Sequence, residues 1–254
     1  MISIDAAEVD AWLTAFLYPL MRMLALMSSA PLLSHTSVPV PVRIGLAVLL
    51  TILVAPTLPV MAAVSPLSAT GMLLVMQQVI AGIALGLAMQ LAFAAVELAG
   101  DMIGLQMGLS FAVFIDPQNS DQTPIVGGFL SMLLMLVFTA INGHLMVISA
   151  LVESFQAFPV KVDGMTGFHW HQLAAAGSQV FSAGLQIALP VIGAMMLANL
   201  ALGVLTRTAP QLNLFAVGFP ITVIVGLLML FFGMPYLLPV LERVLMDGLR
   251  VFIR

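Results

Sequence analysis

The stretch MLLVMQQVIAGIALGLAMQLAFAAVELAGDMIGLQMGLSFAVF, residues 72–114, decides the fold class. It is apolar almost throughout and carries only two charged residues, Glu97 and Asp101. A membrane-crossing helix needs about 20 apolar residues at about 1.5 Å of rise per residue. The stretch is therefore too long for one simple crossing. We expect a helix that tilts strongly, bends back or leaves the bilayer.

The rest of the chain has the same character. Of its 254 residues, 62% are hydrophobic and 7% are charged, against about 25% charged residues in soluble domains. Five further apolar runs cover residues 12–33, 44–64, 125–152, 173–205 and 212–238, and an amphipathic stretch covers 241–254. We predict an all-α fold of membrane-type helical hairpins in a single module, residues 1–254.

The composition also excludes several function classes. The chain has no cysteine, so thiolate metal sites and cysteine nucleophiles are excluded. It has no phosphate-binding loop, dinucleotide fingerprint or H-E-x-x-H motif, and no basic stripe for nucleic acid. Asp5 and Glu8 stand where a signal peptide would carry basic residues, so we expect the first apolar segment to be retained. We predict no enzymatic activity, no cofactor and no metal.

Prolines interrupt several of the apolar runs. Each removes a backbone donor and is expected to kink or end a helix. Broken helices bury freed carbonyls against other helices, whereas ordinary proline kinks need no such partner; both interpretations stay open. The prolines concerned are Pro19, Pro56, Pro59, Pro190, Pro220 and Pro235.

Glycines recur at helical spacing within the long stretch. Gly82 and Gly86 form one G-x-x-x-G unit, and Gly100, Gly104 and Gly108 form two more. Such units place side-chain-free patches on one helix face and allow close helix approach. They predict either packing inside this chain or assembly with another subunit.

Two acidic residues share a face of the same stretch. Glu97 and Asp101 are four residues apart, so their carboxylates repel and need water, protons or cations. We count them among the buried charges, with Arg22 or Arg207 as possible counter-charges. A proton relay of a secondary transporter is one interpretation, and a wetted helix end or a subunit interface is the other.

The segment GLSFAVFIDPQNSDQTP, residues 108–124, joins an apolar half to a polar turn. Proline disfavours helix in the residue before it, so Asp116-Pro117 predicts a helix end near Ile115. The result is a tip that carries Phe111 and Phe114. In an aqueous pore such a tip could form a hydrophobic constriction; in lipid it would be an ordinary helix end.

This segment and its neighbours resemble the FliR family of the bacterial flagellar export apparatus. Residues 97–100 (ELAG) and 104–107 (GLQM) precede the segment, and a second match, LTRTAPQLNLF, covers residues 205–215. Gly218-Phe219-Pro220 and Gly226 follow the second match, and Asn142-Gly143-His144 falls in the family's order. The resemblance extends over nearly the whole chain.

The resemblance implies an export gate in the bacterial inner membrane at the flagellar basal body. It implies a hetero-oligomeric helical pore built with the P and Q components, beside a B-type switch protein, an A-type export protein and membrane lipids. Unfolded flagellar subunits would pass through it. Residues 1–176 would be similar to the P component and residues 177–254 to the Q component. The equivalent subunit of a virulence injectisome is the alternative.

The resemblance also assigns a plug to the segment. Residues of the plug would seal the closed pore, with Asp116-Pro117 forming its turn. The plug residues implied in this way are Gly108, Leu109, Ser110, Phe111, Ala112, Val113, Phe114, Ile115, Asp116 and Pro117.

Overall fold

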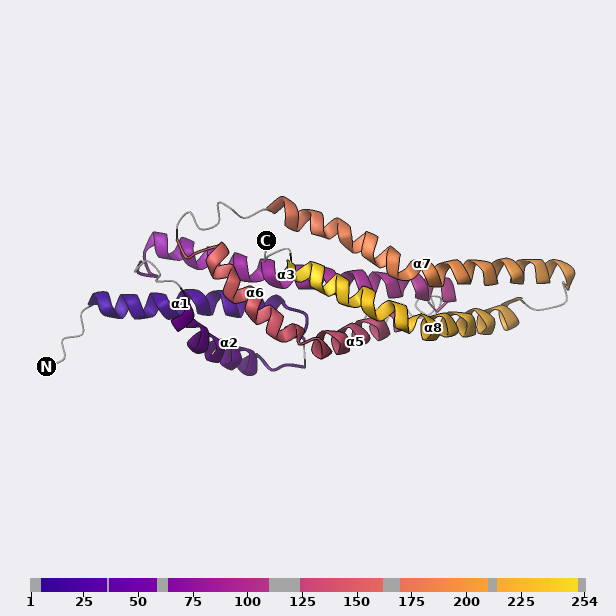
Figure 1. Cartoon of the computed structure of the whole chain (residues 1–254), viewed down its shortest axis with the longest axis horizontal. Helices are drawn as coiled ribbons and strands as arrows, with labels where there is room; N and C mark the ends of the chain where they lie inside the picture. The colour runs from indigo at the N-terminus through magenta and orange to yellow at the C-terminus, as the bar shows by residue number, and fades with distance from the viewer. Residues whose placement is uncertain are drawn as a thin grey trace. The chain divides into compact units, whose positions relative to one another are not determined.

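The structure is a computed structural model, and it describes residues 6–35, 37–58, 64–109, 124–161, 170–209 and 214–250. All secondary structure in these ranges is helical (Figure 1). The helices are α1 (Ala6–Ser29), α2 (Val40–Val54), the short 3₁₀ helix η1 (Ala55–Thr57), α3 (Ala69–Met107), α5 (Ile125–Ala140), α6 (Gly143–Ala157), α7 (Trp170–Thr208) and α8 (Leu214–Arg250). The predicted all-α, membrane-type fold class is confirmed.

Four described segments are long and apolar enough to cross a membrane: Val40–Thr57, Ala69–Met107, Leu173–Thr208 and Val217–Asp247. α5 and α6 pass the same test as a pair, with a bend of 70° between them, and could supply a fifth. α3 is one continuous helix of 39 residues, about 58 Å long at 1.5 Å per residue. The long stretch therefore does not fold back on itself within the described residues.

The chain divides into two compact units. Unit 1 holds residues 1–91, 142–176 and 247–254, and unit 2 holds residues 92–141 and 177–246. α3 contributes its first part to unit 1 and its second part to unit 2. The likeness of residues 1–176 and 177–254 to two different components stays a prediction.

In unit 1, α1 lies along the first part of α3 (Figure 1). Ser68 begins α3 as its N-cap, because its hydroxyl oxygen accepts a hydrogen bond from the backbone N–H of Gly71 at 3.0 Å. This satisfies one of the four backbone donors that have no partner within the first turn of a helix. The cap fixes where the long helix starts.

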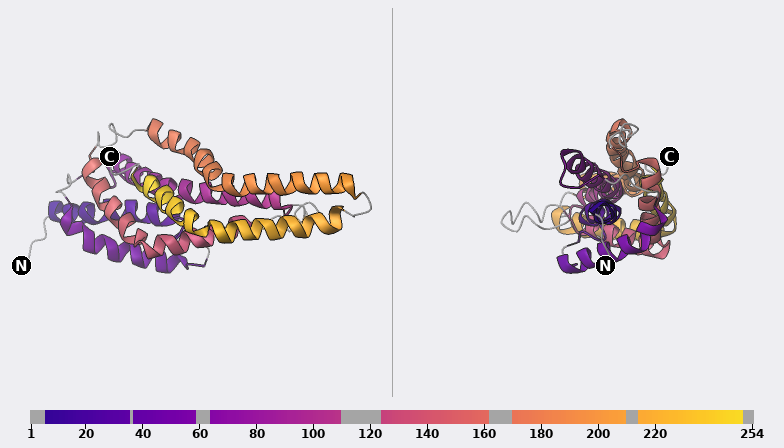
Figure 2. Two further views of the ribbon diagram at one scale, coloured as in Figure 1. Left: turned by 45° about the vertical axis from the view of Figure 1, so that its right-hand side comes forward. Right: turned by 90° about the vertical axis from the view of Figure 1, so that its left-hand side faces the viewer.

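In unit 2, α7 and α8 run alongside one another as a helical hairpin (Figure 2). Pro190 lies inside α7, and Pro220 and Pro235 lie inside α8. Pro19 likewise lies inside α1. None of these prolines ends its helix. Both α7 and α8 change direction along their length, which agrees with the kink that was the other predicted outcome (Figures 1 and 2).

Helix ends occur at two other sites within the predicted runs. Pro56 lies in η1, directly after α2, and Pro59 lies outside the described residues. The run 125–152 divides at Asn142, whose φ of 57° is left-handed. Asparagine tolerates this conformation better than most residues, and the chain turns there from α5 into α6.

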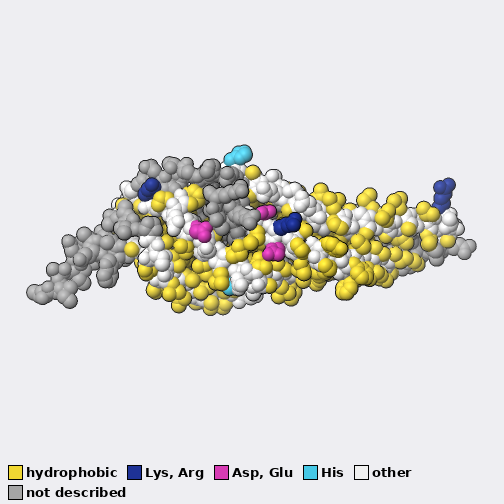
Figure 3. Space-filling view, in the orientation of Figure 1, with side chains coloured by type: hydrophobic (Ala, Val, Ile, Leu, Met, Phe, Trp, Pro, Cys, Tyr) yellow, Lys and Arg dark blue, Asp and Glu magenta, His cyan; other side chains and the backbone are white. Residues whose placement is uncertain are grey.

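Much apolar surface remains exposed in the single chain. Hydrophobic side chains spread over the described part of the face drawn in Figure 3, and charged groups on it are few. In the apolar 18-residue window of each span, 17% of the residues are buried in α2 and in α8, and 22% in α7, against 56% in α3. α3 is thus the central helix of the fold, and the other three present apolar faces outward.

Candidate functional site

The end of α3 is the point from which the predicted plug segment leaves the fold. Gly108 has a φ of 79°. Its N–H donates to the carbonyl oxygen of Leu105 at 3.1 Å, and the N–H of Leu109 donates to that of Gly104 at 3.0 Å. This pair of bonds is the Schellman motif that closes helices at a left-handed glycine. α3 therefore ends at Met107, before the predicted helix end near Ile115, which itself lies outside the described residues.

Helix α8 holds this end of α3 within unit 2. The Thr222 hydroxyl donates to the backbone carbonyl oxygen of Met107 at 3.1 Å. The Met107 side chain is fully buried. It packs against Gly226, where an added Cβ would lie 2.5 Å from its Cγ. The absence of a side chain at Gly226 therefore makes room for Met107, and the last turn of α3 is fixed to α8.

Helix α5 holds the other end of the segment. It begins at Ile125 after Pro124, and its residue Gly127 lies so close to Gly100 of α3 that a Cβ on Gly100 would collide with the Cα of Gly127. One turn later, a Cβ on Gly104 would make only ordinary contact with Val126, at 3.7 Å. Residues 110–123 therefore connect the end of α3 to the start of α5, and these two helices are in contact close to both points. We call this contact, with its attachment to α8, the stem.

Of the predicted plug residues, Gly108 and Leu109 belong to the stem. The remaining eight, Ser110 to Pro117, lie outside the described residues. Their sealing role stays a prediction, because the geometry of the stem does not test it.

The acidic pair lies beside the stem. Asp101 is half-buried, and its Oδ1 is enclosed next to Gly127 without a hydrogen-bond partner in the described part of the chain. Glu97 is exposed in the single chain. The expectation of burial thus fails for Glu97, because its position on α3 faces outward where no described helix covers it.

Arg22 of unit 1 is almost completely buried, with 1% of its surface exposed. Its Nε donates to Gln78 Oε1 at 2.9 Å, and its two terminal nitrogens donate to Ser154 Oγ at 2.9 Å and to the Phe158 carbonyl oxygen at 2.8 Å. Its guanidinium carbon lies 3.9 Å from the centre of the Phe155 ring. We call these five residues the Arg22 node.

The Arg22 node joins α1, α3 and the end of α6 through neutral groups alone. A buried cation needs hydrogen-bonding partners to offset its desolvation, and here an amide, a hydroxyl, a carbonyl and an aromatic face supply them. The role of counter-charge to the acidic pair, proposed for Arg22 from the sequence, therefore has no support in these contacts. Its contacts indicate a structural role.

The first glycine pair stands next to the node. A Cβ on Gly82 would collide with the backbone oxygen of Arg22 and lie 2.7 Å from the Cβ of Ala25. A Cβ on Gly86 would lie 2.6 Å from the Cβ of Ser29. These contacts bring α3 against α1 within this chain; whether either glycine pair also serves assembly stays a prediction.

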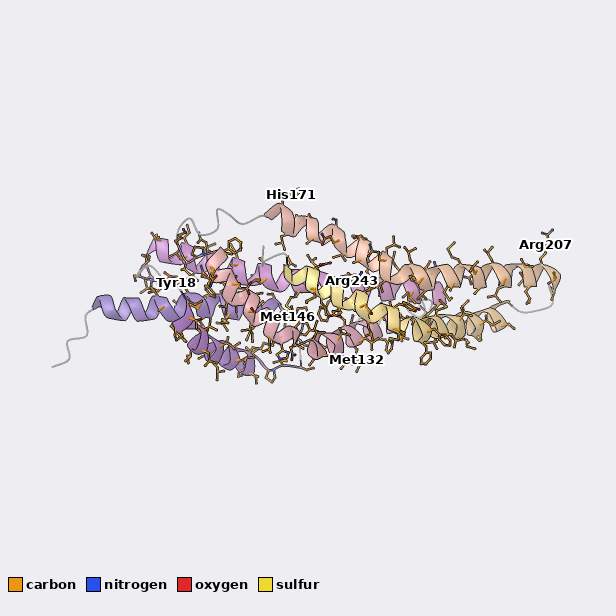
Figure 4. The ribbon with its side chains drawn as sticks, in the orientation of Figure 1. Tyr18, Met132, Met146, His171, Arg207 and Arg243 are labelled. Carbon is orange, nitrogen blue, oxygen red and sulfur yellow. The ribbon has the colours of Figure 1, made fainter. Side chains whose placement is uncertain are left out.

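Arg207 and the histidines lie apart from both regions. Arg207 is exposed in the last turn of α7 (Figure 4), so its predicted burial is wrong for the single chain. His144 and His171 are also exposed. Among the described residues, no group of three His, Cys, Asp or Glu side chains is placed to hold a metal ion.

Sequence reasoning missed the partners that define both regions. Gln78 and Ser154 are 56 and 132 residues away from Arg22, and nothing local to them signals the pairing. Gly127 and Thr222 were missed for the same reason. The Schellman end had a readable signal, since glycine is the commonest residue after a helix terminus.

Comparison with known proteins places the whole chain in one family. The profile described as "Bacterial export proteins, family 1" matches residues 13–248. A flagellar biosynthetic protein FliR from Escherichia coli (strain K12) is 43% identical over 243 residues, which are 96% of this chain and 93% of that protein. The protein of the same name from Pectobacterium carotovorum subsp. carotovorum is 42% identical over 244 residues, with the same two coverages.

The likeness extends to distant bacteria. A flagellar biosynthetic protein FliR from Bacillus subtilis (strain 168) is 33% identical over 236 residues, which are 91% of this chain and 90% of that protein. Identity at this level over almost the full length of both chains is consistent with one shared helical fold. The chain therefore belongs to bacterial export proteins family 1, the family of the flagellar biosynthetic protein FliR.

Proposed function

We propose that this chain is a structural and gating subunit of the flagellar type III protein export gate in the bacterial inner membrane. In this proposal the segment Gly108–Pro117 closes the pore until a flagellar subunit passes. Family membership supports the export role, and the relatives compared above carry flagellar names, which favours the flagellar over the injectisome alternative.

The observation that carries the gating proposal is the stem. A closing loop must return to one position, so its two ends need a rigid support. The Schellman bonds at Gly108, the Thr222 hydrogen bond to Met107 and the Gly100–Gly127 contact supply such a support in unit 2.

The chemistry of the segment suits closure. Phe111, Phe114 and Ile115 offer bulky apolar side chains, and a narrow apolar ring excludes water and ions by dewetting. The sequence Asp116-Pro117 is of a kind that favours a turn. No bond is made or broken in this function, so the proposal needs no catalytic group and no cofactor.

The proposed partners follow from the surface and the family. The exposed apolar faces of α2, α7 and α8 would be covered by the P and Q components and by lipid, with the B-type switch protein and the A-type export protein adjoining the gate. The exported substrates would be unfolded flagellar subunits, which need a path but no folded binding site.

The export role is tested by removing and restoring the gene in its host. Loss of the chain should abolish flagellar subunits in the culture medium and abolish swimming, and the unaltered chain should restore both. If the strain without the chain still exports flagellar subunits, the proposed function is wrong. The same holds if restoring the chain does not restore their export.

A further inference from the structure

The turn between α1 and α2 holds a small group of polar side chains at the start of an apolar helix. Arg43, in the first turn of α2, donates from Nη2 to the backbone carbonyl oxygen of His35 at 2.6 Å. The backbone N–H of Ser37 donates to His35 Nδ1 at 3.3 Å, and the Ser37 hydroxyl lies 3.1 Å from the same nitrogen. We call Arg43, His35 and Ser37 the α2 cation site; it lies wholly within unit 1.

The Arg43 guanidinium uses few of its donors within the chain. It has five N–H groups and stays charged at any physiological pH. Nε is enclosed without a partner in the described part of the chain. Nη1 is not enclosed and forms no hydrogen bond to a described residue. An outward-facing donor group of the guanidinium is therefore available to a ligand.

No acidic residue near Arg43 in the sequence offsets its charge. Residues 11–96 contain neither Asp nor Glu, and no ion pair of Arg43 occurs among the described residues. Glu153, elsewhere in unit 1, accepts a hydrogen bond from the Ser149 hydroxyl on its own helix. The positive charge at the α2 cation site is thus left for an anion from outside the chain.

An apolar stripe runs along α2 away from this site. Its members are spaced four, three and four residues apart, so they share a helix face. The span Val40–Thr57 has 18 residues and is about 27 Å long, close to the thickness of a hydrocarbon core. Arg43 lies within one turn of its end, at the level of the lipid headgroups. The stripe consists of Val42, Leu46, Leu49 and Leu53, which are 56%, 38%, 55% and 64% exposed.

These features together match a phospholipid. A phosphate oxygen accepts strong, charge-assisted hydrogen bonds from a guanidinium. Because the Ser37 N–H donates to His35 Nδ1, the ring proton of His35 is on Nε2, and this exposed side chain offers a second donor. Acyl chains need an apolar surface, which the stripe supplies. Free inorganic phosphate would use the donors but leave the stripe without a role.

The charge pattern also selects the headgroup. A zwitterionic lipid brings its own ammonium group, which would lie near Arg43 where residues 11–96 provide no carboxylate to receive it. An anionic lipid brings no such cation. Basic groups at the membrane surface attract anionic lipids for this reason.

We propose that the α2 cation site binds the phosphate of an anionic glycerophospholipid whose acyl chains lie along the α2 stripe. The inference requires only that α2 lies in a membrane, so it does not depend on the gating role. It goes beyond general contact with lipid, because it assigns a class of headgroup to named donors.

The test is photo-crosslinking in the host's own membranes with p-benzoylphenylalanine in place of Leu46, three residues after Arg43. The lipid in each adduct is identified by mass spectrometry. One basic residue near the surface strengthens binding of an anionic lipid about fivefold, so we expect anionic lipids to be enriched about fivefold in the adducts over their share in the whole membrane. Adducts in the same proportion as the membrane, or adducts with protein alone, would overturn the inference.

The role of Arg43 is tested with the same probe. Arg43→Gln should bring the enrichment down to the membrane average, and Arg43→Lys, which keeps the charge, should retain most of it. Arg207→Gln is the matched control, since it also removes one exposed positive charge but far along the chain on α7, and should leave the enrichment unchanged. Enrichment that survives Arg43→Gln would show that the site is elsewhere. The measurement without this variant remains decisive if the variant does not fold.

A last arm separates lipid from free phosphate. The purified chain with the same probe is placed in phosphatidylcholine vesicles that contain a minor share of phosphatidylglycerol. Phosphatidylglycerol should be enriched in the adducts, and excess inorganic phosphate should not reduce this enrichment, because the acyl chains also hold the lipid. A reduction to the vesicle average would show that the site takes free phosphate and would overturn the inference. None of these measurements reads export, so their failure leaves the proposed function standing.

Discussion

The two parts of α3 use the same glycine spacing but leave their polar neighbours in opposite states. In unit 1, Gly82 brings α3 against α1, and each of the three guanidinium nitrogens of Arg22 donates to an acceptor. In unit 2, Gly100 brings α3 against α5, yet Asp101 Oδ1 next to this contact has no partner in the described residues.

The polar groups at the first contact therefore have their hydrogen-bond partners within the chain, whereas a polar atom beside the second contact does not. A buried cation with three hydrogen bonds and an aromatic face is satisfied within the chain and holds three elements together. An enclosed carboxylate oxygen without a donor is costly alone, so the acidic side of the stem is the place where a further group would be favourable. The contacts of the Arg22 node therefore stabilise the fold, whereas in the proposed function the stem supports the gate.

The largest effect is expected from adding a side chain where α3 and α5 are in close contact at the stem. Gly100→Ala puts a methyl group into the backbone of Gly127, which lies 2.5 Å from the new Cβ at its nitrogen. Backbone cannot yield as a side chain can, so we expect a loss of about 3 kcal/mol or more. The measurement is the amount of folded chain in membranes.

Gly104→Ala is the matched control. Its Cβ would meet Val126 at 3.7 Å, and alanine favours helix over glycine by up to about 1 kcal/mol. Normal or increased folded chain is expected. Equal loss in both variants would contradict the account of the stem.

The next effect concerns the Arg22 node. Arg22→Leu should lower the thermal stability of unit 1 in detergent by roughly 3 kcal/mol, because it leaves Gln78, Ser154 and the Phe158 carbonyl without their buried donor. Arg43→Leu is the control, since Arg43 is only half-buried and makes one hydrogen bond, to the His35 carbonyl oxygen. A stable Arg22→Leu protein would show that the node is dispensable.

A smaller effect is expected at the attachment of α3 to α8. Thr222→Val removes the hydrogen bond to the Met107 carbonyl and should cost about 1 kcal/mol, measured as the thermal unfolding midpoint in detergent. Thr206→Val removes only a hydrogen bond to the carbonyl oxygen of Gly203, within α7 itself. A larger loss in Thr206→Val would argue against attachment through Thr222.

The smallest effect is expected at Asp101. Asp101→Asn removes a charge whose Oδ1 has no partner among the described residues, so stability should stay within about 1 kcal/mol or rise. Gln78→Leu, which removes an acceptor of the Arg22 guanidinium, should cost about 2 kcal/mol in the same assay. A larger loss of stability in Asp101→Asn than in Gln78→Leu would contradict this comparison of the two parts of α3.

The apolar runs predicted the existence of the long helices well, because lipid and protein interiors both select for them. The same runs gave the wrong position for helix ends that depend on single residues. The Asp116-Pro117 pair led to a predicted helix end near Ile115, whereas α3 already ends before Gly108. The run 125–152 gave no sign of the turn at Asn142. Residues 241–250 of the predicted amphipathic stretch belong to α8.

The site was harder to predict than the fold. The glycine spacing pointed to close contacts, but it did not reveal which element each glycine meets. Charge alone suggested that Arg22 faces the acids, whereas its partners are neutral groups far away in sequence. Such pairings arise from tertiary packing, which a local pattern does not encode. The family resemblance, in contrast, came from two long motifs and was confirmed.

The central claim is that the apolar half of the segment after the stem seals the pore. The most direct measurement is the ion conductance of the purified, assembled complex in planar lipid bilayers. Deletion of Phe111–Ile115 should convert a closed complex into one with steady conductance, whereas replacing Gln118–Gln122 by Gly and Ser residues should leave it closed. A complex that stays closed after the deletion, with assembly intact, would contradict the claim.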